Sequence, residues 1–259
     1  MNTAIITGAS SGIGREFVTQ LANDGDIDEI WVIARREQRL NELKTEVDKP
    51  IYVLPLDLTD ENALARYSDE LKAKNPNVTL LVNCSGFGKF GGYDEIPISD
   101  SLDMIDLNCK ALTYITEATV PYMGVGARII ELCSCSAFQP LPYMNVYAAT
   151  KAYVLSYSRA LFEELKPKKI HVLAVCPSWV KTEFIDSAKS TDSCAVKNFK
   201  NVYTADRVVR LALRDSKKFG KRISVCGLPT KLQHIGAKLY PTALCMRVWL
   251  RLQKMTRNS

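Results

Sequence analysis

The residues of this chain best suited to proton transfer are a tyrosine, a lysine and a serine that lie close together in the sequence. Tyr147 and Lys151 are four positions apart, so in a helix they share one face, one turn from each other. An ammonium near a phenol favours the phenolate, and we therefore expect Lys151 to lower the pKa of Tyr147 toward working pH. Ser134 follows an apolar run typical of a strand, where its hydroxyl is suited to hydrogen-bond a substrate oxygen. Such groups can transfer a proton as a carbonyl becomes an alcohol, although an ordinary helix face is the alternative for the Tyr–Lys pair.

A glycine-rich turn near the N-terminus predicts a nucleotide site. Residues 3–7 form a β-branched, apolar run typical of a buried strand, and residues 15–22 have helical spacing. In a dinucleotide-binding turn of this kind, glycines let the backbone approach a pyrophosphate, and the helix N-terminus offers free N–H groups to it. A plain glycine-rich β–α turn is the alternative. The predicted cofactor contacts are Gly8, Ser10, Ser11, Gly12, Ile13 and Gly14.

Two arginines follow the second predicted strand, residues 30–34. An acidic residue in that place binds the ribose 2′-hydroxyl of NAD(H), whereas Arg35 and Arg36 stand there in this chain. Guanidinium groups pair well with a 2′-phosphate, so the sequence favours NADP(H) over NAD(H). A solvated helix N-terminus is the alternative, but cations are disfavoured at that end of a helix.

Further cofactor contacts are expected where later strands end. Asp57 and Leu58 follow the third strand, and Asp57 is expected either to touch the adenine or to cap the next helix, a role for which Asp60 is equally suited. Asn83 ends the fourth strand and Gly86 lies in the turn after it. Because ligands of open α/β sheets gather at the carboxyl ends of the strands, we include Asn83 and Gly86 in the predicted cofactor site.

The periodicity predicts one α/β domain with a doubly wound parallel sheet. Short apolar runs alternate with helical patterns, which indicates a Rossmann-like, seven-stranded sheet covered by helices on both faces. We assign residues 1–227 to this domain and residues 228–259 to a C-terminal helical extension of it. The predicted strands are residues 3–7, 30–34, 51–54, 78–83, 129–133, 170–176 and 222–226, and the helices after the first are residues 37–47, 61–73, 99–123, 146–165 and 205–214.

Composition excludes several classes of function. The net charge of +6 is too mild and too dispersed for a nucleic-acid partner. Eight cysteines include no C-x-x-C pair and mostly lie in apolar runs, which indicates reduced thiols and a cytoplasmic location. With only two histidines we expect no metal site, and His171, inside a strand pattern, is expected to be structural. We find no signal-peptide pattern and no apolar window long enough for a transmembrane helix.

Two segments outside the regular pattern are candidate substrate elements. Residues 183–203 are polar and weakly periodic, which predicts a loop that covers the substrate, with a plain surface excursion as the alternative. Residues 239–255 have helical spacing, with a basic stripe and a wide apolar arc. We expect this tail to pack against the core or a partner subunit; an appendage that contacts a membrane surface or shields a lipid-like substrate is the less favoured alternative.

Taken together, these motifs resemble those of the short-chain dehydrogenase/reductase family over about residues 3–227. The resemblance rests on the turn from Thr7 to Gly14, on Asn83-Cys-Ser-Gly86, and on a segment with Pro177, Val180 and Thr182 that follows the sixth strand. Asn108, Ser134, Tyr147 and Lys151 fall where the family has its catalytic tetrad. The chain departs from the family pattern at Cys84-Ser85 and at Ser178, which replaces a glycine and weakens the cofactor role carried over to Thr182.

The resemblance implies an NADP(H)-dependent oxidoreductase that acts on a carbonyl/alcohol pair. It makes Tyr147 the proton donor in reduction, Lys151 the partner of the nicotinamide ribose, Ser134 the partner of the substrate oxygen, and Asn108 the holder of a water next to Lys151. Pro177, Val180 and Thr182 become nicotinamide contacts, and a homodimer or homotetramer is expected.

The aromatic residues Trp179, Phe184, Phe199 and Tyr203 favour an apolar substrate of steroid-like, acyl or aromatic type. A non-catalytic NADP(H)-binding sensor is the alternative, and an isomerase on the same scaffold is a third.

Overall fold

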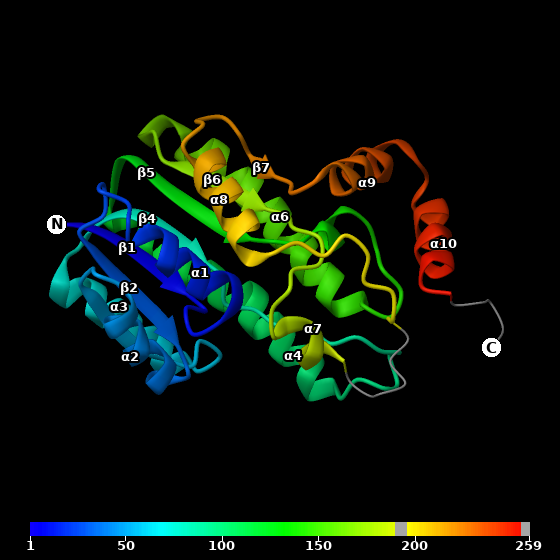
Figure 1. Ribbon diagram of the computed structural model, residues 1–259, viewed down its shortest axis with the longest axis horizontal. Coiled ribbons are helices and arrows are strands. Elements are labelled where there is room, and N and C mark those ends of the chain that lie inside the picture. The colour runs from blue at the N-terminus through cyan, green and yellow to red at the C-terminus, as the bar shows by residue number, and fades with distance from the viewer. Residues whose placement is uncertain (190–195, 255–259) are drawn as a thin grey trace.

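A seven-stranded parallel sheet forms the centre of the molecule. The computed structural model describes residues 1–189 and 196–254, and its strands lie in the order β3-β2-β1-β4-β5-β6-β7 (Figure 1). The strand order reverses between β1 and β4, because β2 and β3 follow on one side of β1 and the later strands follow on the other side of β4. The crevice for a ligand therefore opens at the carboxyl ends of β1 and β4. The strands are β1 Asn2–Thr7, β2 Glu29–Ala34, β3 Ile51–Pro55, β4 Asn77–Asn83, β5 Met123–Leu132, β6 His171–Val175 and β7 Ile223–Ser224.

Helices cover both faces of this sheet, as predicted. Successive strand residues point to opposite faces, so Ile6 packs against one helical layer and Ile5 against the other. The first layer holds α1 Gly12–Leu21, α2 Glu37–Glu46 and α8 Ala205–Ser216, and the second holds α3 Glu61–Lys74, α5 Leu112–Thr119 and α6 Asn145–Leu165. Because both faces are buried, the strands are nearly continuous apolar runs, which is why their positions were predictable.

The predicted helix over residues 99–123 is wrong in detail. The structure has α4 Ile98–Ile105, a π-helical turn at Asp106–Ala111, α5, and a 3-10 turn at Val120–Tyr122, while Met123 already belongs to β5. Pro121 lies in that 3-10 turn, and a proline lacks the N–H that a continuing helix needs. A π turn inside a helix often marks a functional position, and here it carries Asn108.

The C-terminal extension contains two helices where one was predicted. α9 spans Leu228–Leu239 and α10 spans Thr242–Leu252, so the predicted helix over residues 239–255 begins too early; its last residue lies outside the described residues. Tyr240 is extended at the break because the following proline disfavours helical backbone in the residue before it. Both helices extend beyond the carboxyl end of the sheet, far from the N-terminus (Figure 1).

Two further findings concern single features. His171 is buried, and its ring nitrogens Nδ1 and Nε2 each lie 2.7 Å from a backbone oxygen, of Ser216 and Lys221 respectively, which confirms a structural role. Within residues 1–189 and 196–254, every helix is too short or too polar to cross a bilayer.

Candidate active site

A single large cavity joins the glycine turn to the C-terminal helices. Its volume is about 1160 Å³, above the range of about 300–1,000 Å³ common for small-molecule sites, so it has room for a cofactor and a substrate together. The predicted cofactor residues that line it are Gly8, Ser10, Ser11, Gly12, Ile13, Gly14, Arg35, Arg36, Asp57, Leu58, Gly86, Pro177, Val180 and Thr182. Ser134, Tyr147 and Lys151 line it as well.

Close backbone contacts shape the glycine turn. Gly8 has φ +68°, and a Cβ atom on it would lie 2.8 Å from the backbone of Cys84. A Cβ on Gly14 would lie 2.3 Å from the carbonyl oxygen of Gly8. The backbone N–H groups of Cys84 and Ser85 both donate to Thr7 Oγ1 at 3.0 Å, which ties the end of β4 to the end of β1. Glycine is therefore required where the two turns meet.

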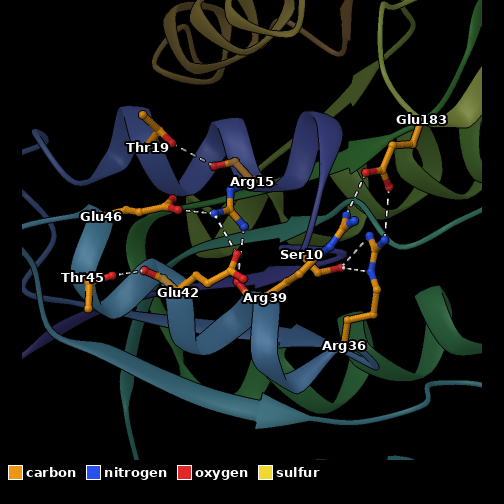
Figure 2. Close-up of polar contacts among 9 residues, drawn as sticks. All are labelled: Ser10, Arg15, Thr19, Arg36, Arg39, Glu42, Thr45, Glu46 and Glu183. Carbon is orange, nitrogen blue, oxygen red and sulfur yellow. Dashed lines mark hydrogen bonds and ion pairs between the residues drawn. The ribbon is translucent and has the colours of Figure 1, made fainter.

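The arginines after β2 lie beside this turn, but they are placed differently. Arg36 donates to Ser10 Oγ, and its Nη1 lies 3.1 Å from Glu183 Oε2 (Figure 2). Its Nη2 also donates to Ser11 Oγ at 2.7 Å. The Arg35 side chain is 74% exposed and lies 3.8 Å from Asp57. Arg36 is thus held at the mouth of the turn, whereas Arg35 projects toward solvent.

Asp57 does not cap the next helix. Its Oδ1 accepts hydrogen bonds from the N–H and the hydroxyl of Thr59, and Asp60 is the residue that caps α3 by accepting from Asn62 N. Of the two roles expected for Asp57, the capping role is therefore excluded, and the carboxylate lies at the cavity wall near Arg35.

Tyr147 and Lys151 lie one turn apart on α6, with Ser134 just beyond the end of β5. Lys151 Nζ lies 5.9 Å from the centre of the Tyr147 ring and donates to the carbonyl oxygen of Leu132 at 2.8 Å. Ser134 caps the short 3-10 turn Cys135–Phe138, accepting a hydrogen bond from Ser136 N. Strand end and helix thus bring the three side chains to the same cavity wall.

The expected direction of the Tyr147 pKa is wrong for this protein. Burial raises the pKa of Tyr147 above its ordinary value, and a hydrogen bond with Ser134 opposes that shift only in part. Burial also lowers the pKa of Lys151. The charge of Lys151 by itself would lower the pKa of Tyr147, whereas removal from water disfavours the charged form of each group.

Asn108 lies behind the cavity wall. Its side chain is fully buried and is held by Phe87, whose N–H donates to Oδ1 at 3.1 Å and whose carbonyl accepts from Nδ2 at 2.9 Å. A Cβ on Gly86 would lie 2.8 Å from Asn108 Oδ1 and 3.4 Å from Lys151 Nζ. The asparagine therefore lies close to the lysine, although it is not among the residues that line the cavity.

Asn83 is the predicted cofactor residue that the structure places away from the cavity. It is 2% exposed, and its amide donates to Thr116 Oγ1 at 2.9 Å and to Glu131 Oε1 at 3.2 Å. Burial raises the pKa of Glu131 to about 7, while hydrogen bonds from Thr116 and Asn83 oppose the shift. Asn83 is the last residue of β4, and its side chain points between the sheet and α5. It therefore stabilises the end of the strand and does not face the cavity.

An aromatic cluster stands over Tyr147. Phe184 lies 5.5 Å from Tyr147 between ring centres, and Trp179 packs edge-on against both Phe90 and Phe199. Tyr203, predicted to join them, instead packs in the core layer of α1 and α8. In the segment 183–203 the structure has α7 Phe184–Ala188, and residues 190–195 lie outside the described residues.

Two charged residues of the site were not predicted. Arg39 lies one helical turn after Arg36, and its Nη1 donates to Glu183 Oε1 at 2.8 Å (Figure 2). The spacing of Arg39 from Arg36 was a usable signal, since residues three apart share a helix face. Glu183 had no comparable signal, because its partners lie 144 and 147 residues away in the sequence.

The comparison with known families decides the class of this fold. The family model described as short chain dehydrogenase matches residues 2–193. The chain belongs to the short chain dehydrogenase family. The fold and the order of the motifs described above are those expected for an oxidoreductase of this family.

Three relatives illustrate the similarity. The NADP-dependent 3-hydroxy acid dehydrogenase YdfG of Escherichia coli (strain K12) is 31% identical over 76% of this chain and 81% of its own. A short-chain dehydrogenase from Sphingobium yanoikuyae, solved in complex with NADPH, has a TM-score of 0.77 at 28% identity and covers 92% of this chain and 93% of its own. The bulky-bulky ketone specific alcohol dehydrogenase from Comamonas testosteroni has a TM-score of 0.71 at 25% identity, covering 100% of this chain and 95% of its own.

Proposed function

We propose that this protein is an NADP(H)-dependent carbonyl reductase and alcohol dehydrogenase whose substrates are bulky and apolar. The observation that carries the proposal is that Ser134, Tyr147 and Lys151 line the same cavity as the glycine turn. A proton donor and a nucleotide-binding turn therefore face one space, as carbonyl reduction requires.

In this proposal Tyr147 donates the proton to the carbonyl oxygen during reduction and takes it back during oxidation. The Tyr147 phenol is protonated at neutral pH, as a proton donor must be, and its hydrogen bond with Ser134 opposes the rise in pKa that burial causes. Ser134 hydrogen-bonds the same oxygen, and Lys151, held by Leu132 O, is placed to reach the ribose of the cofactor. Asn108, which lies close to Lys151 behind the cavity wall, is the proposed holder of a water that connects the lysine to solvent. When bound, the nicotinamide supplies the hydride in reduction and accepts it in oxidation.

The residues present fit NADP(H). A side chain at Gly8 or Gly14 would collide with neighbouring backbone and distort the turn, whose residues Ser10, Ser11, Gly12 and Ile13 line the cavity where a pyrophosphate would bind. Arg35 and Arg36 are the proposed partners of the 2′-phosphate, and Asp57 and Leu58 those of the adenine. Gly86, Pro177, Val180 and Thr182 are assigned to the nicotinamide half. The NADP(H) named for YdfG and for the Sphingobium enzyme supports this choice.

The aromatic cluster and the C-terminal helices support a bulky apolar substrate. Trp179, Phe184 and Phe199 gather beside Tyr147, and α10 contributes Leu244, Val248 and Trp249 to the cavity. The similar ketone-specific enzyme from Comamonas testosteroni, which matches this chain over its full length, is named for bulky ketones.

We also infer that the protein forms a homodimer or homotetramer through the helices near Asn108 and Tyr147. Apolar side chains of α4 are exposed there, with Ile98 79%, Leu102 55% and Ile105 45% accessible. Exposed apolar residues on one helix suit a symmetric contact between copies of the chain.

The test measures the turnover of a panel of bulky ketones with NADPH in the wild-type protein and in Tyr147→Phe. The readout is the loss of NADPH absorbance. We expect kcat to fall about 10²–10⁴-fold in the variant because the proton donor is gone, while NADPH affinity stays within about twofold. Tyr52→Phe in β3 is the matched control, since its hydroxyl bonds Glu70 Oε2 at 2.7 Å, outside the cavity and away from the proposed interface. If Tyr147→Phe retains wild-type turnover, the assigned donor is wrong; tight NADPH binding with no ketone reduced would favour a cofactor sensor.

A further inference from the structure

Glu183 bridges two arginines at the mouth of the glycine turn. One carboxylate oxygen, Oε2, lies 3.1 Å from Arg36 Nη1, and the other, Oε1, lies 2.8 Å from Arg39 Nη1 (Figure 2). Glu183 stands directly before α7 and lines the cavity, whereas both arginines belong to the N-terminal half of the chain. Hydrogen bonds from Arg39 and Arg36 lower the pKa of Glu183, so its carboxylate is ionised at neutral pH.

Arg36 does not depend on Glu183 for its position. Its Nε and Nη2 both donate to Ser10 Oγ, at 3.2 and 3.1 Å, and Nη2 also donates to Ser11 Oγ at 2.7 Å. These bonds fix one edge of the planar guanidinium to the glycine turn. The remaining nitrogen, Nη1, points to Glu183 and is the edge on which an incoming anion would have to bind.

A carboxylate and a phosphate monoester bind a guanidinium in the same way, through its N–H donors and its positive charge. Arg36 and Arg39 carry two positive charges, and Glu183 cancels one of them. Arg35 adds a third cation beside Asp57, which cancels another. A 2′-phosphate placed here would meet two carboxylates as well as three guanidinium groups.

We propose that Glu183 is a specificity-determining residue: its carboxylate occupies the Arg36 and Arg39 donors that a 2′-phosphate would use, and so lowers the preference for NADP(H) over NAD(H). The inference rests on the proposed function, because it takes Arg36 as a partner of the 2′-phosphate. Binding of NADPH has to displace or share the Glu183 contacts, whereas NADH, with a neutral 2′-hydroxyl, leaves them in place. The charge of the Glu183 side chain thereby sets how strongly the protein distinguishes NADP(H) from NAD(H).

The chain offers a matched control for the loss of one negative charge. Glu46 is also a partly exposed glutamate in an ion pair with an arginine, Arg15, on the neighbouring helix (Figure 2). Glu46→Gln changes the net charge of the protein as Glu183→Gln does, but it frees no donor of Arg36 or Arg39. A difference between the two variants therefore reports the local competition and not the overall charge.

The experiment measures dissociation constants of NADPH and NADH by fluorescence titration for the wild-type protein, Glu183→Gln and Glu46→Gln, at low and at high salt. We expect Glu183→Gln to bind NADPH about two- to fivefold more tightly, the size of an exposed ion pair, with NADH unchanged. The gain should shrink at high salt, where exposed charges are screened. Glu46→Gln should match the wild type for both cofactors.

Weaker NADPH binding in Glu183→Gln would overturn the proposal, because it would mean that Glu183 helps to hold the arginines for the phosphate. Equal changes for NADPH and NADH, or the same gain in Glu46→Gln, would overturn it too. The proposed function fails separately: in that case the wild-type protein itself shows no preference for NADPH over NADH. Equal thermal unfolding midpoints of the three proteins confirm that the variants are folded.

Discussion

The two ends of the cavity are built on different principles. At the glycine-turn end the wall is backbone: Gly8 and Gly14 leave no room for a Cβ, which would approach neighbouring backbone atoms to 2.8 and 2.3 Å. At the other end the wall is made of half-exposed side chains from α9 and α10, and a Cβ on Gly236 would meet nothing closer than Tyr240 at 3.8 Å. A wall made of close backbone contacts accepts a ligand of one shape, whereas a wall made of side chains accepts ligands of many shapes. We infer that the first end fits one invariant ligand and the second determines the substrate.

The sharpest test of this contrast exchanges a glycine for alanine at each end. Gly14→Ala places a methyl group against the Gly8 carbonyl, and such overpacking should lower the free energy of unfolding by about 1–3 kcal/mol. Because the Gly8 backbone must shift to relieve the contact, NADPH binding should also weaken, by about tenfold to a hundredfold. Gly236→Ala, within α9, should raise stability by about 0.5–1 kcal/mol because alanine is the better helix former. Isothermal titration with NADPH and thermal unfolding measure the two effects.

Equal tolerance of both substitutions would remove the distinction between the two ends. A Gly14→Ala protein that fails to fold would leave the ligand question to Gly8→Ala, whose Cβ meets the Cys84 backbone at a positive φ. Loss of NADPH affinity in Gly236→Ala would show that the C-terminal helices also shape the cofactor end.

A second prediction separates the charges of the glycine-turn end from its backbone. Arg35→Ala combined with Arg36→Ala should weaken NADPH binding about tenfold or more, since a charge-assisted hydrogen bond contributes about 1.5–3 kcal/mol and exposure reduces this. NADH affinity should fall much less than NADPH affinity, because the glycines of the turn are unchanged and the turn loses only the Arg36 bonds to Ser10 and Ser11. Cofactor titrations in parallel check this, and equal losses for the two cofactors would mean that the arginines do not bind the phosphate.

The two ends also differ in how far they could be predicted. The strands and the glycine turn follow from local patterns, β-branched runs and a glycine motif, that need no knowledge of distant residues. The partners of Glu183 could not be predicted in this way, because Arg36 and Arg39 reach it only through the folded sheet. Arg36 was predicted as a contact of the 2′-phosphate, but its pairing with Ser10 was not foreseen.

Burial is the other quantity that local patterns do not supply. The lysine four residues after Tyr147 suggested a lowered pKa for the phenol, yet desolvation within the fold raises it. Asn83 was assigned to the cofactor for its position in a strand end, while its side chain points beneath the sheet to Thr116 and Glu131. In both cases the residue lies in the helix or strand predicted for it. The groups that surround its side chain could not be predicted, because they belong to other elements of the fold.

The smallest effect is expected from the substrate end, where a chain that stops at Leu239 tests the role of α10. This truncation removes Leu244, Val248 and Leu252 from the cavity wall, together with the hydrogen bond from Trp249 Nε1 to Pro142 O at 3.0 Å. These side chains are 43–50% exposed, so each gives a ligand only part of the roughly 1.5–3 kcal/mol of a fully buried side chain. We expect KM for a bulky ketone to rise about fivefold to tenfold, with little change for a small aldehyde and with NADPH affinity unchanged.

Val248→Ser keeps the helix and removes one apolar contact, so KM should rise less than in the truncated chain, again for the bulky ketone and not for the small aldehyde. This variant provides the test even if the truncated chain is unstable. Because the apolar arc of α10 lines the cavity of its own chain, we expect the oligomeric mass and the co-sedimentation with lipid vesicles to stay unchanged. A fall in either would mean that α10 serves a partner subunit or a membrane surface. An equal rise in KM for small and bulky carbonyls would mean that α10 acts on the active site as a whole, and the proposed division between a fixed cofactor end and an adaptable substrate end would then be wrong.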